Sequence, residues 1–143
     1  MQRIKLVIQG VPIPKQSARF YGKNVGGKVK IMSYQKAEIK ANTTDIKSQA
    51  LSLIPHDFKP FEKGIGLSVT FIFPPPKSMS KSDLKKIENG EIVYKTTSPD
   101  LHDNLKKNLI DSLHGIIFTN DSRICYEEKN VKIYGLNPRT EVS

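Results

Sequence analysis

Two stretches of the chain alternate apolar residues with polar or smaller ones, the pattern of a β-strand with one buried face. The first covers residues 2–10 and ends at Gly10, and the clearer second covers residues 65–73 and ends at three consecutive prolines. Gly26 and Gly27 predict a turn between two shorter strands. We predict further strands at residues 18–24, 28–32, 91–96, 116–118 and 123–134. The last two are expected to form a hairpin around a polar turn at 119–122.

Three other segments have the capping and breaking residues of helices. The predicted helices cover residues 33–53 with Ser33 as cap and Pro55 beyond the end, 80–88 closed by Asn89-Gly90, and 99–114 with Ser98 as cap and Gly115 beyond the end. We therefore expect residues 1–143 to form a single α+β domain, in which helices pack on a small, largely antiparallel or mixed sheet.

The helix predicted at 99–114 is amphipathic. At about 100° per residue, four leucines fall on one side and a group of charged residues falls within a sector of roughly 80° on the other. The leucines are Leu101, Leu105, Leu109 and Leu113, and the charged group is Asp100, Asp103, Lys107, Asp111 and His114. The leucines are expected to dock the helix on the core.

Two interpretations of the charged face remain open. It can be an ordinary solvated face, in which Asp103 and Lys107 form an i,i+4 ion pair. Alternatively it can be a site, because Asp121 follows on a short return of the chain and is expected to lie beside the N-terminal half of the helix. Several carboxylates brought together repel one another unless a cation lies among them, and such oxygen ligands suit Mg²⁺ or Mn²⁺.

Composition narrows the function classes. The chain is 37% hydrophobic with a mean hydropathy of −0.42, and no apolar run approaches the length of a membrane helix. One cysteine, Cys125, excludes an intramolecular disulfide and a multi-cysteine metal site. A cytoplasmic protein without a membrane partner is therefore expected.

Charge points to a polyanionic partner. The formal net charge is +9, and residues 1–60 hold 11 basic and 3 acidic side chains, whereas residues 96–143 hold 6 and 7. A basic surface attracts nucleic acid through counterion release. The carboxylates thus gather in the last third of a chain whose first half is basic.

Three motifs make the sequence resemble the RusA-type Holliday-junction resolvases. The family has a Pro-Asp-x-Asp-Asn-x-x-x-Lys stretch, an Asp-Ala-Leu a few residues later, and a Phe-x-Asp-Asp-x-Gln-Ile turn. The matching segments are Pro99-Asp100-Leu101-His102-Asp103-Asn104-Leu105-Lys106-Lys107, then Asp111-Ser112-Leu113, then Phe118-Thr119-Asn120-Asp121-Ser122-Arg123-Ile124, with a proline-bearing basic loop at Gly10–Arg19.

This resemblance implies a metal-dependent endodeoxyribonuclease that cuts four-way DNA junctions in recombination and repair. It implies a homodimer that makes paired symmetric nicks, Mg²⁺ as cofactor with Mn²⁺ as substitute, and a bacterial or phage origin. The metal-binding carboxylates would be Asp100, Asp103 and Asp121, and Lys107 would be the essential lysine. Asp111 matches the aspartate of the second motif and would be accessory.

The sequence departs from the family pattern at several places, one of which is Arg123, where the family has Gln. Two residues rather than one separate Asp100 from Asp103, so either their relative orientation differs or the start of the helix bulges. His102 lies in that gap and is an alternative ligand. The usual Asp-Asp pair is Asn120-Asp121, and Asn120 can still coordinate or hydrogen-bond but brings no charge.

The loop at residues 11–20 contains two prolines, which favour an extended conformation. The basic residues of this region are Lys15, Arg19 and, further on, Lys23. They would bind backbone phosphates if the loop contacts DNA. Alternatively, they are solvated residues of a surface loop. Two other functions remain as alternatives to a junction resolvase. One is a nuclease that prefers flaps or replication forks, and the other is an inactive junction-binding protein.

Overall fold

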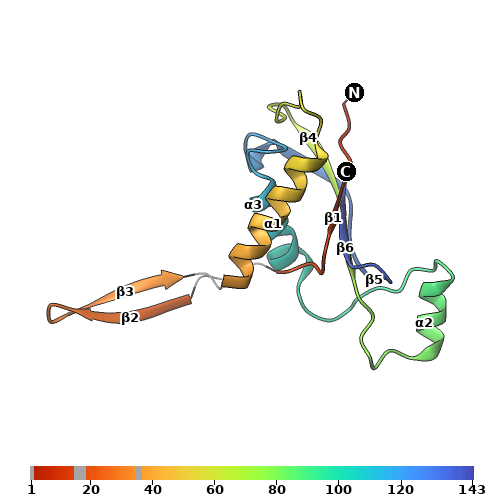
Figure 1. The fold of residues 1–143 in the computed structure, drawn as a ribbon, viewed down its shortest axis with the longest axis horizontal. Coiled ribbons are helices and arrows are strands. Elements are labelled where there is room, and N and C mark those ends of the chain that lie inside the picture. Colours follow the sequence, from red (N-terminus) through yellow and green to blue (C-terminus); the bar gives the residue numbers. More distant parts are fainter. Residues whose placement is uncertain (1, 15–18, 35–36) are drawn as a thin grey trace.

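The computed structural model describes residues 2–14, 19–34 and 37–143, and among these the side chains of residues 19–25, 28–34, 37–39 and 103 are not described. The architecture is a four-stranded mixed sheet with helices, which confirms the predicted α+β class (Figure 1). The four strands lie in the order β1 (Leu6–Gln9), β6 (Arg139–Val142), β4 (Ile65–Phe73) and β5 (Ile124–Tyr134).

The central strands explain the mixed character of the sheet. β6 pairs antiparallel with both β1 and β4, whereas β5 runs parallel to β4. The predicted strand at 65–73 is confirmed residue for residue, and the predicted strand at 2–10 is shortened to β1. β6 was not predicted, because four residues are too short an alternation to stand out from a loop.

A separate hairpin consists of β2 (Arg19–Val25) and β3 (Lys28–Tyr34). Gly26 and Gly27 form its turn with φ of +59° and +79°, a backbone region that favours glycine, as the sequence predicted. The hairpin extends away from the four-stranded sheet (Figure 1). Its second strand includes Ser33, which pairs with Phe20, so the prediction of Ser33 as a helix cap is wrong.

Two helices cover the sheet and close the core. The first, α1, runs over Ala37–Leu53 and packs against the third helix, described below. The core joins side chains from both helices, from β1 and from alternate positions of β4. Its buried members include Leu6, Ile8, Ile46, Ala50, Leu67, Val69, Phe71, Phe73, Leu105, Leu109, Leu113, Phe118 and Val142.

The chain between β4 and β5 crosses over the sheet. It contains α2 (Lys81–Glu88), which confirms the helix predicted at 80–88. Ser80 is the N-cap, and its hydroxyl accepts a hydrogen bond from the Asp83 backbone N–H. The prediction of a strand at 91–96 is wrong. There Tyr94 makes only an isolated bridge with Ile133, although the Tyr134 N–H also donates to the Val93 carbonyl.

The predicted hairpin of 116–118 with 123–134 is also wrong. Phe118 forms isolated parallel bridges with Phe61 and His114, while β5 joins the far side of β4. The reason is the crossover, since a strand that follows a helix packed on the sheet returns in the same direction as the strand before it. No helix within residues 2–14, 19–34 and 37–143 is long and apolar enough to cross a membrane.

Candidate functional site

The helix with the four leucines begins with a π-helical turn. The turn, η1, covers Leu101–Lys106, and a regular helix, α3, continues over Lys107–Leu113. Asp100 is the N-cap, and its carbonyl accepts a hydrogen bond from the Leu105 N–H at 3.1 Å, five residues on. The helix therefore starts two residues later than predicted, and Ser98 is not its cap.

The leucine side of this helix is buried as predicted. Leu105, Leu109 and Leu113 are 1–2% exposed, and Leu101 packs against the same core. The burial fixes how the helix is rotated, so its opposite side faces outward.

The π-turn lies where the extra residue separates Asp100 from Asp103. A π-turn holds one more residue than an α-turn, so it accommodates the insertion while the leucines stay on the core. Of the two consequences that the sequence left open, the bulged helix start is the one observed. The turn also rotates residues 100–103 relative to α3. The charged residues therefore do not share the single sector of roughly 80° that an ideal helix over 99–114 would give them.

A polar ridge runs along the outward side of α3, and we define it by Lys107, Asp111, His114 and Asp121. Lys107 and His114 are exposed and Asp111 is half-buried. At 1.5 Å per residue, Lys107 and His114 lie about 10 Å apart along the helix axis. The ridge is thus open to a large ligand along its length.

Asp121 lies at the C-terminal end of this helix, not beside its N-terminal half as the sequence predicted. The His114 ring Nδ1 is 2.8 Å from Asp121 Oδ1, and both side chains are about half exposed. The chain reaches this position because Gly115 has φ of +82° and ends the helix, after which a short helix, η2 (Asp121–Arg123), follows. Asn120 is the N-cap of η2, where its Oδ1 accepts from the Ser122 N–H at 3.0 Å.

The structure does not by itself assemble a metal site from the carboxylates it describes. Among described side chains, which exclude that of Asp103, no three His, Cys, Asp or Glu residues are grouped so that they could hold a metal ion. Asp100 is exposed at the start of η1 and Asp121 at the other end of the helix. The predicted roles of these carboxylates remain predictions.

Strand β5 supports the π-turn with two lysine contacts that sequence reasoning missed. Lys132 Nζ donates to the carbonyls of Thr97 and Pro99 at 2.6 and 2.8 Å, immediately before Asp100. Lys106 Nζ forms an ion pair with Glu127 Oε1 at 2.8 Å, with side chains 18% and 28% exposed. These contacts join residues more than 20 positions apart in the sequence, so no local sequence pattern predicts them.

A third anchor is Asn108, which is 2% exposed next to Lys107. Its Nδ2 donates to the Ile13 carbonyl at 3.0 Å and to Asn42 Oδ1 at 2.8 Å, and its Oδ1 accepts from the Thr43 hydroxyl at 3.3 Å. Asn108 therefore ties the helix to α1 and to the proline-bearing loop. An asparagine on the leucine side of the helix was the signal that could have revealed it.

The predicted DNA-binding residues are described only in part. Lys15 lies outside the described residues, and Arg19 and Lys23 belong to β2 with their side chains outside the description. Residues 11–14 of the same segment form no regular element, as expected for the extended loop. Cys125 is exposed in β5.

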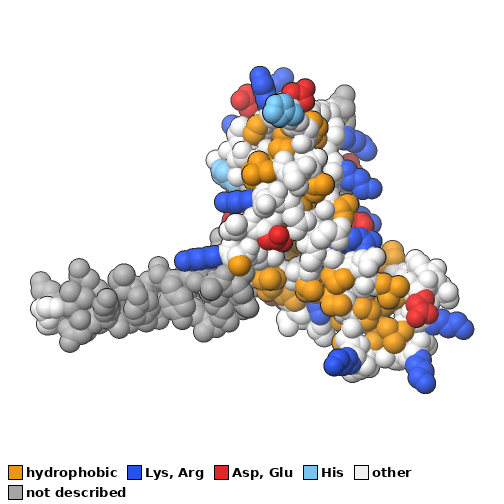
Figure 2. All heavy atoms as spheres, viewed as in Figure 1, with side chains coloured by type: hydrophobic (Ala, Val, Ile, Leu, Met, Phe, Trp, Pro, Cys, Tyr) orange, Lys and Arg blue, Asp and Glu red, His pale blue; other side chains and the backbone are white. Residues whose placement is uncertain are grey.

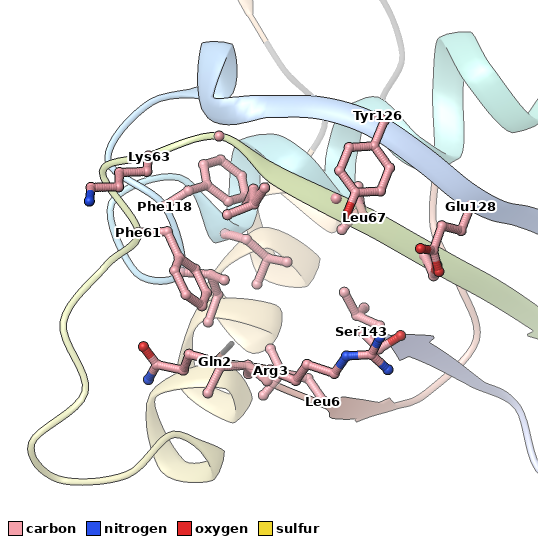
Figure 3. Close-up of a pocket in the computed structure, with 18 residues that line it drawn as sticks. Gln2, Arg3, Leu6, Phe61, Lys63, Leu67, Phe118, Tyr126, Glu128 and Ser143 are labelled. Carbon is pink, nitrogen blue, oxygen red and sulfur yellow. The ribbon is translucent and has the colours of Figure 1, made fainter.

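A cavity of about 350 Å³ lies near the C-terminal end of α3, where Leu113 and Phe118 line it (Figure 3). Its walls are mainly apolar and include Phe61, Leu67 and Phe118, with Arg3 and Glu128 also lining it. None of the candidate site residues lines this cavity. The candidate chemistry therefore lies on the exposed ridge and not in the cavity.

A net charge of +9 favours a polyanionic partner such as a nucleic acid. The family model of endodeoxyribonuclease RusA matches residues 9–143, and the chain belongs to this family. Membership supports an endodeoxyribonuclease of the Holliday-junction resolvase class. The matched range includes the whole helix, the ridge and β5.

The chain is also similar to the uncharacterized protein YqaN of Bacillus subtilis (strain 168). The two are 30% identical over 147 residues, which cover 99% of this chain and 95% of YqaN. The comparison with solved structures finds no match.

Proposed function

We propose that the polar ridge, together with Asp100 and Asp103 at the start of its helix, is the active site of a Mg²⁺-dependent nuclease. The enzyme resolves Holliday junctions by paired symmetric nicks and acts as a homodimer in the cytoplasm of a bacterial cell. The observation that carries the proposal is the family match over residues 9–143, and within it Lys107 and Asp111 lie on the helix side opposite the buried leucines.

The carboxylates have the donor chemistry of a site for a hard divalent cation, but the structure holds Asp100 and Asp121 at opposite ends of the helix, so one ion could not bind both without a rearrangement. Asp100, Asp103 and Asp121 offer only carboxylate oxygens, which are the ligands that Mg²⁺ and Mn²⁺ prefer. Asp121 Oδ1 is engaged by His114, so we assign ligation to its other oxygen. When bound, such an ion supplies a nucleophilic water at neutral pH and neutralises charge on the phosphate oxygens.

The chain's own cation on the ridge is Lys107. It is exposed and follows Asp103 by four residues, so it can approach a phosphate held at the carboxylates. There its ammonium stabilises the negative charge that develops on the phosphoryl oxygens or on the leaving oxygen. Asp111, one turn further, is an accessory residue that sets the charge around Lys107.

The basic segments hold the junction arms. In this proposal Lys15, Arg19 and Lys23 contact backbone phosphates. Arg19 and Lys23 belong to the hairpin that projects from the sheet, which would reach toward a junction arm (Figure 1). Lys and Arg side chains also lie around the edge of the face drawn in Figure 2, including the part where α2 lies in Figure 1. A homodimer suits a four-way junction, since both have two-fold symmetry.

The experiment that tests the proposal is cleavage of a labelled mobile four-way junction beside linear duplex and a flap, each with Mg²⁺ and with EDTA. Paired symmetric nicks that are confined to the junction and require the metal are expected. Cutting of flaps or forks instead would favour a branch nuclease. Tight junction binding without cutting would leave a recognition protein, and either result would overturn the resolvase proposal.

A further inference from the structure

His102, the residue inserted between the two aspartates, is held by a small network from β5. Its Nδ1 lies 3.2 Å from Lys106 Nζ and 3.4 Å from Asn130 Nδ2. Both donors are fixed in turn, because Lys106 Nζ also contacts Glu127 Oε2 at 3.1 Å and Asn130 Nδ2 contacts the same oxygen at 3.4 Å. The side chain of His102 is itself exposed.

The network determines which ring nitrogen carries the proton. An ammonium can only donate hydrogen bonds, and Glu127 Oε2 orients the Asn130 amide with its NH₂ toward the ring. Two donors therefore face Nδ1, which must accept, so the proton of the neutral imidazole lies on Nε2. His102 thus presents an N–H donor at the exposed start of the candidate active-site helix.

We propose that His102 is a DNA-binding residue whose Nε2–H donates a hydrogen bond to a phosphodiester oxygen of the junction backbone. The inference rests on the proposed function, since it assumes that DNA lies along the ridge. A phosphate oxygen is the partner because it is an anionic acceptor, and His102 is exposed within the family motif that the proposed function places at the DNA backbone.

The same geometry argues against His102 as a metal ligand. A metal ion needs a nitrogen lone pair, and the only one on this ring is directed at two donors. Moving the proton to Nδ1 to free Nε2 would break both hydrogen bonds and leave Lys106 with Glu127 alone. Lys106 is no substitute for the role, because its charge is paired with Glu127.

Variants of His102 separate the two roles. Leucine removes the donor, whereas glutamine places an amide N–H near the position of Nε2. We expect His102→Leu to weaken binding of a labelled four-way junction in EDTA by about ten-fold, the effect of one lost hydrogen bond to a charged group. His102→Gln should retain most of the affinity, and His56→Leu, which changes an exposed histidine outside the site, should bind like the wild type.

Metal binding is measured separately, by titrating Mn²⁺ into the protein without DNA. Equal Mn²⁺ affinity of the wild type and His102→Leu is expected. Weaker Mn²⁺ binding by His102→Leu, with unchanged junction binding in EDTA, would show a metal ligand and overturn the inference. Unchanged affinity for both also overturns it while leaving the proposed function intact. A wild-type protein that neither binds nor cuts branched DNA would overturn both.

The positioning role of Lys106 has its own readout. Nitrogen-15 spectra of the histidine rings should show the proton of His102 on Nε2 in the wild type and a mixture of tautomers in Lys106→Met. Because Lys106 acts through His102, Lys106→Met should cost little in a His102→Leu background, although it weakens junction binding on its own. Additive losses, or a proton on Nδ1 in the wild type, would contradict the proposal.

Discussion

Asp121 is the candidate ligand whose surroundings the structure defines best. Its Oδ1 is 2.8 Å from the His114 ring, and that ring lies edge-on to the buried Phe118 with centroids 6.3 Å apart. The packing restricts the ring and therefore the carboxylate bonded to it, in the way that outer partners orient metal ligands. His114 is itself exposed, and it contacts the candidate site through Asp121.

Asp121→Asn keeps the shape of this contact but removes the charge. Because the proposed metal site depends on that charge, we expect junction cleavage to fall at least about a hundred-fold. Junction binding should stay the same or tighten, since a negative charge at the DNA surface is removed. Cleavage is measured with Mg²⁺ and binding in EDTA, with Asp57→Asn at an exposed position outside the site as the control. Normal cutting by Asp121→Asn would refute the metal assignment.

Asn108 is a single residue on which three parts of the chain depend. Asn108→Leu has a similar volume but leaves the Ile13 carbonyl and the Asn42 and Thr43 side chains without these partners. Loss of buried hydrogen bonds of this kind should lower the free energy of unfolding by about 2–4 kcal/mol. Urea unfolding measures the change, with Asn137→Leu at an exposed position as the control. Equal stability of the two variants would contradict the anchoring role.

At the scale of elements, β5 holds the π-turn at both ends. Its pairing with β4 skips Glu128, because Leu67 lies opposite Glu127 and Ser68 opposite Lys129. Such an irregularity re-aims side chains, so Glu127 can reach the same turn as Asn130 three residues on. The strand behind the helix therefore contributes to the geometry of the ridge.

Lys132→Met tests this support. The ammonium binds the carbonyls of Thr97 and Pro99, so its loss should release the segment that leads into Asp100. We expect a decrease of about 1–3 kcal/mol in the free energy of unfolding and slower junction cleavage at saturating DNA. Lys129→Met changes an exposed lysine of the same strand and should alter neither measurement. Similar behaviour of both variants would mean that β5 supports only the sheet.

The elements show why some features follow from sequence and others do not. The leucine spacing at 101–113 depends on a local period of 3.6 and predicted the buried side correctly. The same period cannot reveal a π-turn, because one extra residue changes the hydrogen bonding without changing which leucines are buried. The partner of β5 depends on a crossover of 50 residues, and the Lys106–Glu127 pair depends on that partner.

The whole molecule separates a packed body from a projecting hairpin. β2 and β3 pair only with each other, and the four-stranded sheet with α1 and α3 contains the core. The segment 19–34 carries four basic residues and no acidic one in its sequence. Its composition is therefore that of a DNA-contacting extension, and its strands are not part of the four-stranded sheet.

Replacing residues 19–34 with a short Gly/Ser linker should leave the unfolding of the body almost unchanged, because the strands removed pair only with each other. Junction affinity should fall, and the slope of log affinity against log salt should become shallower by about 0.9 for each phosphate that the protein no longer neutralises. The matched control removes charge from α2 with Lys81→Gln, Lys85→Gln and Lys86→Gln, three exposed lysines on the other side of the molecule. If the control changes the slope as much as the deletion, net charge and not the hairpin governs binding. If only the deletion does, the hairpin holds a junction arm, and its removal should weaken binding without abolishing cleavage at high DNA concentration.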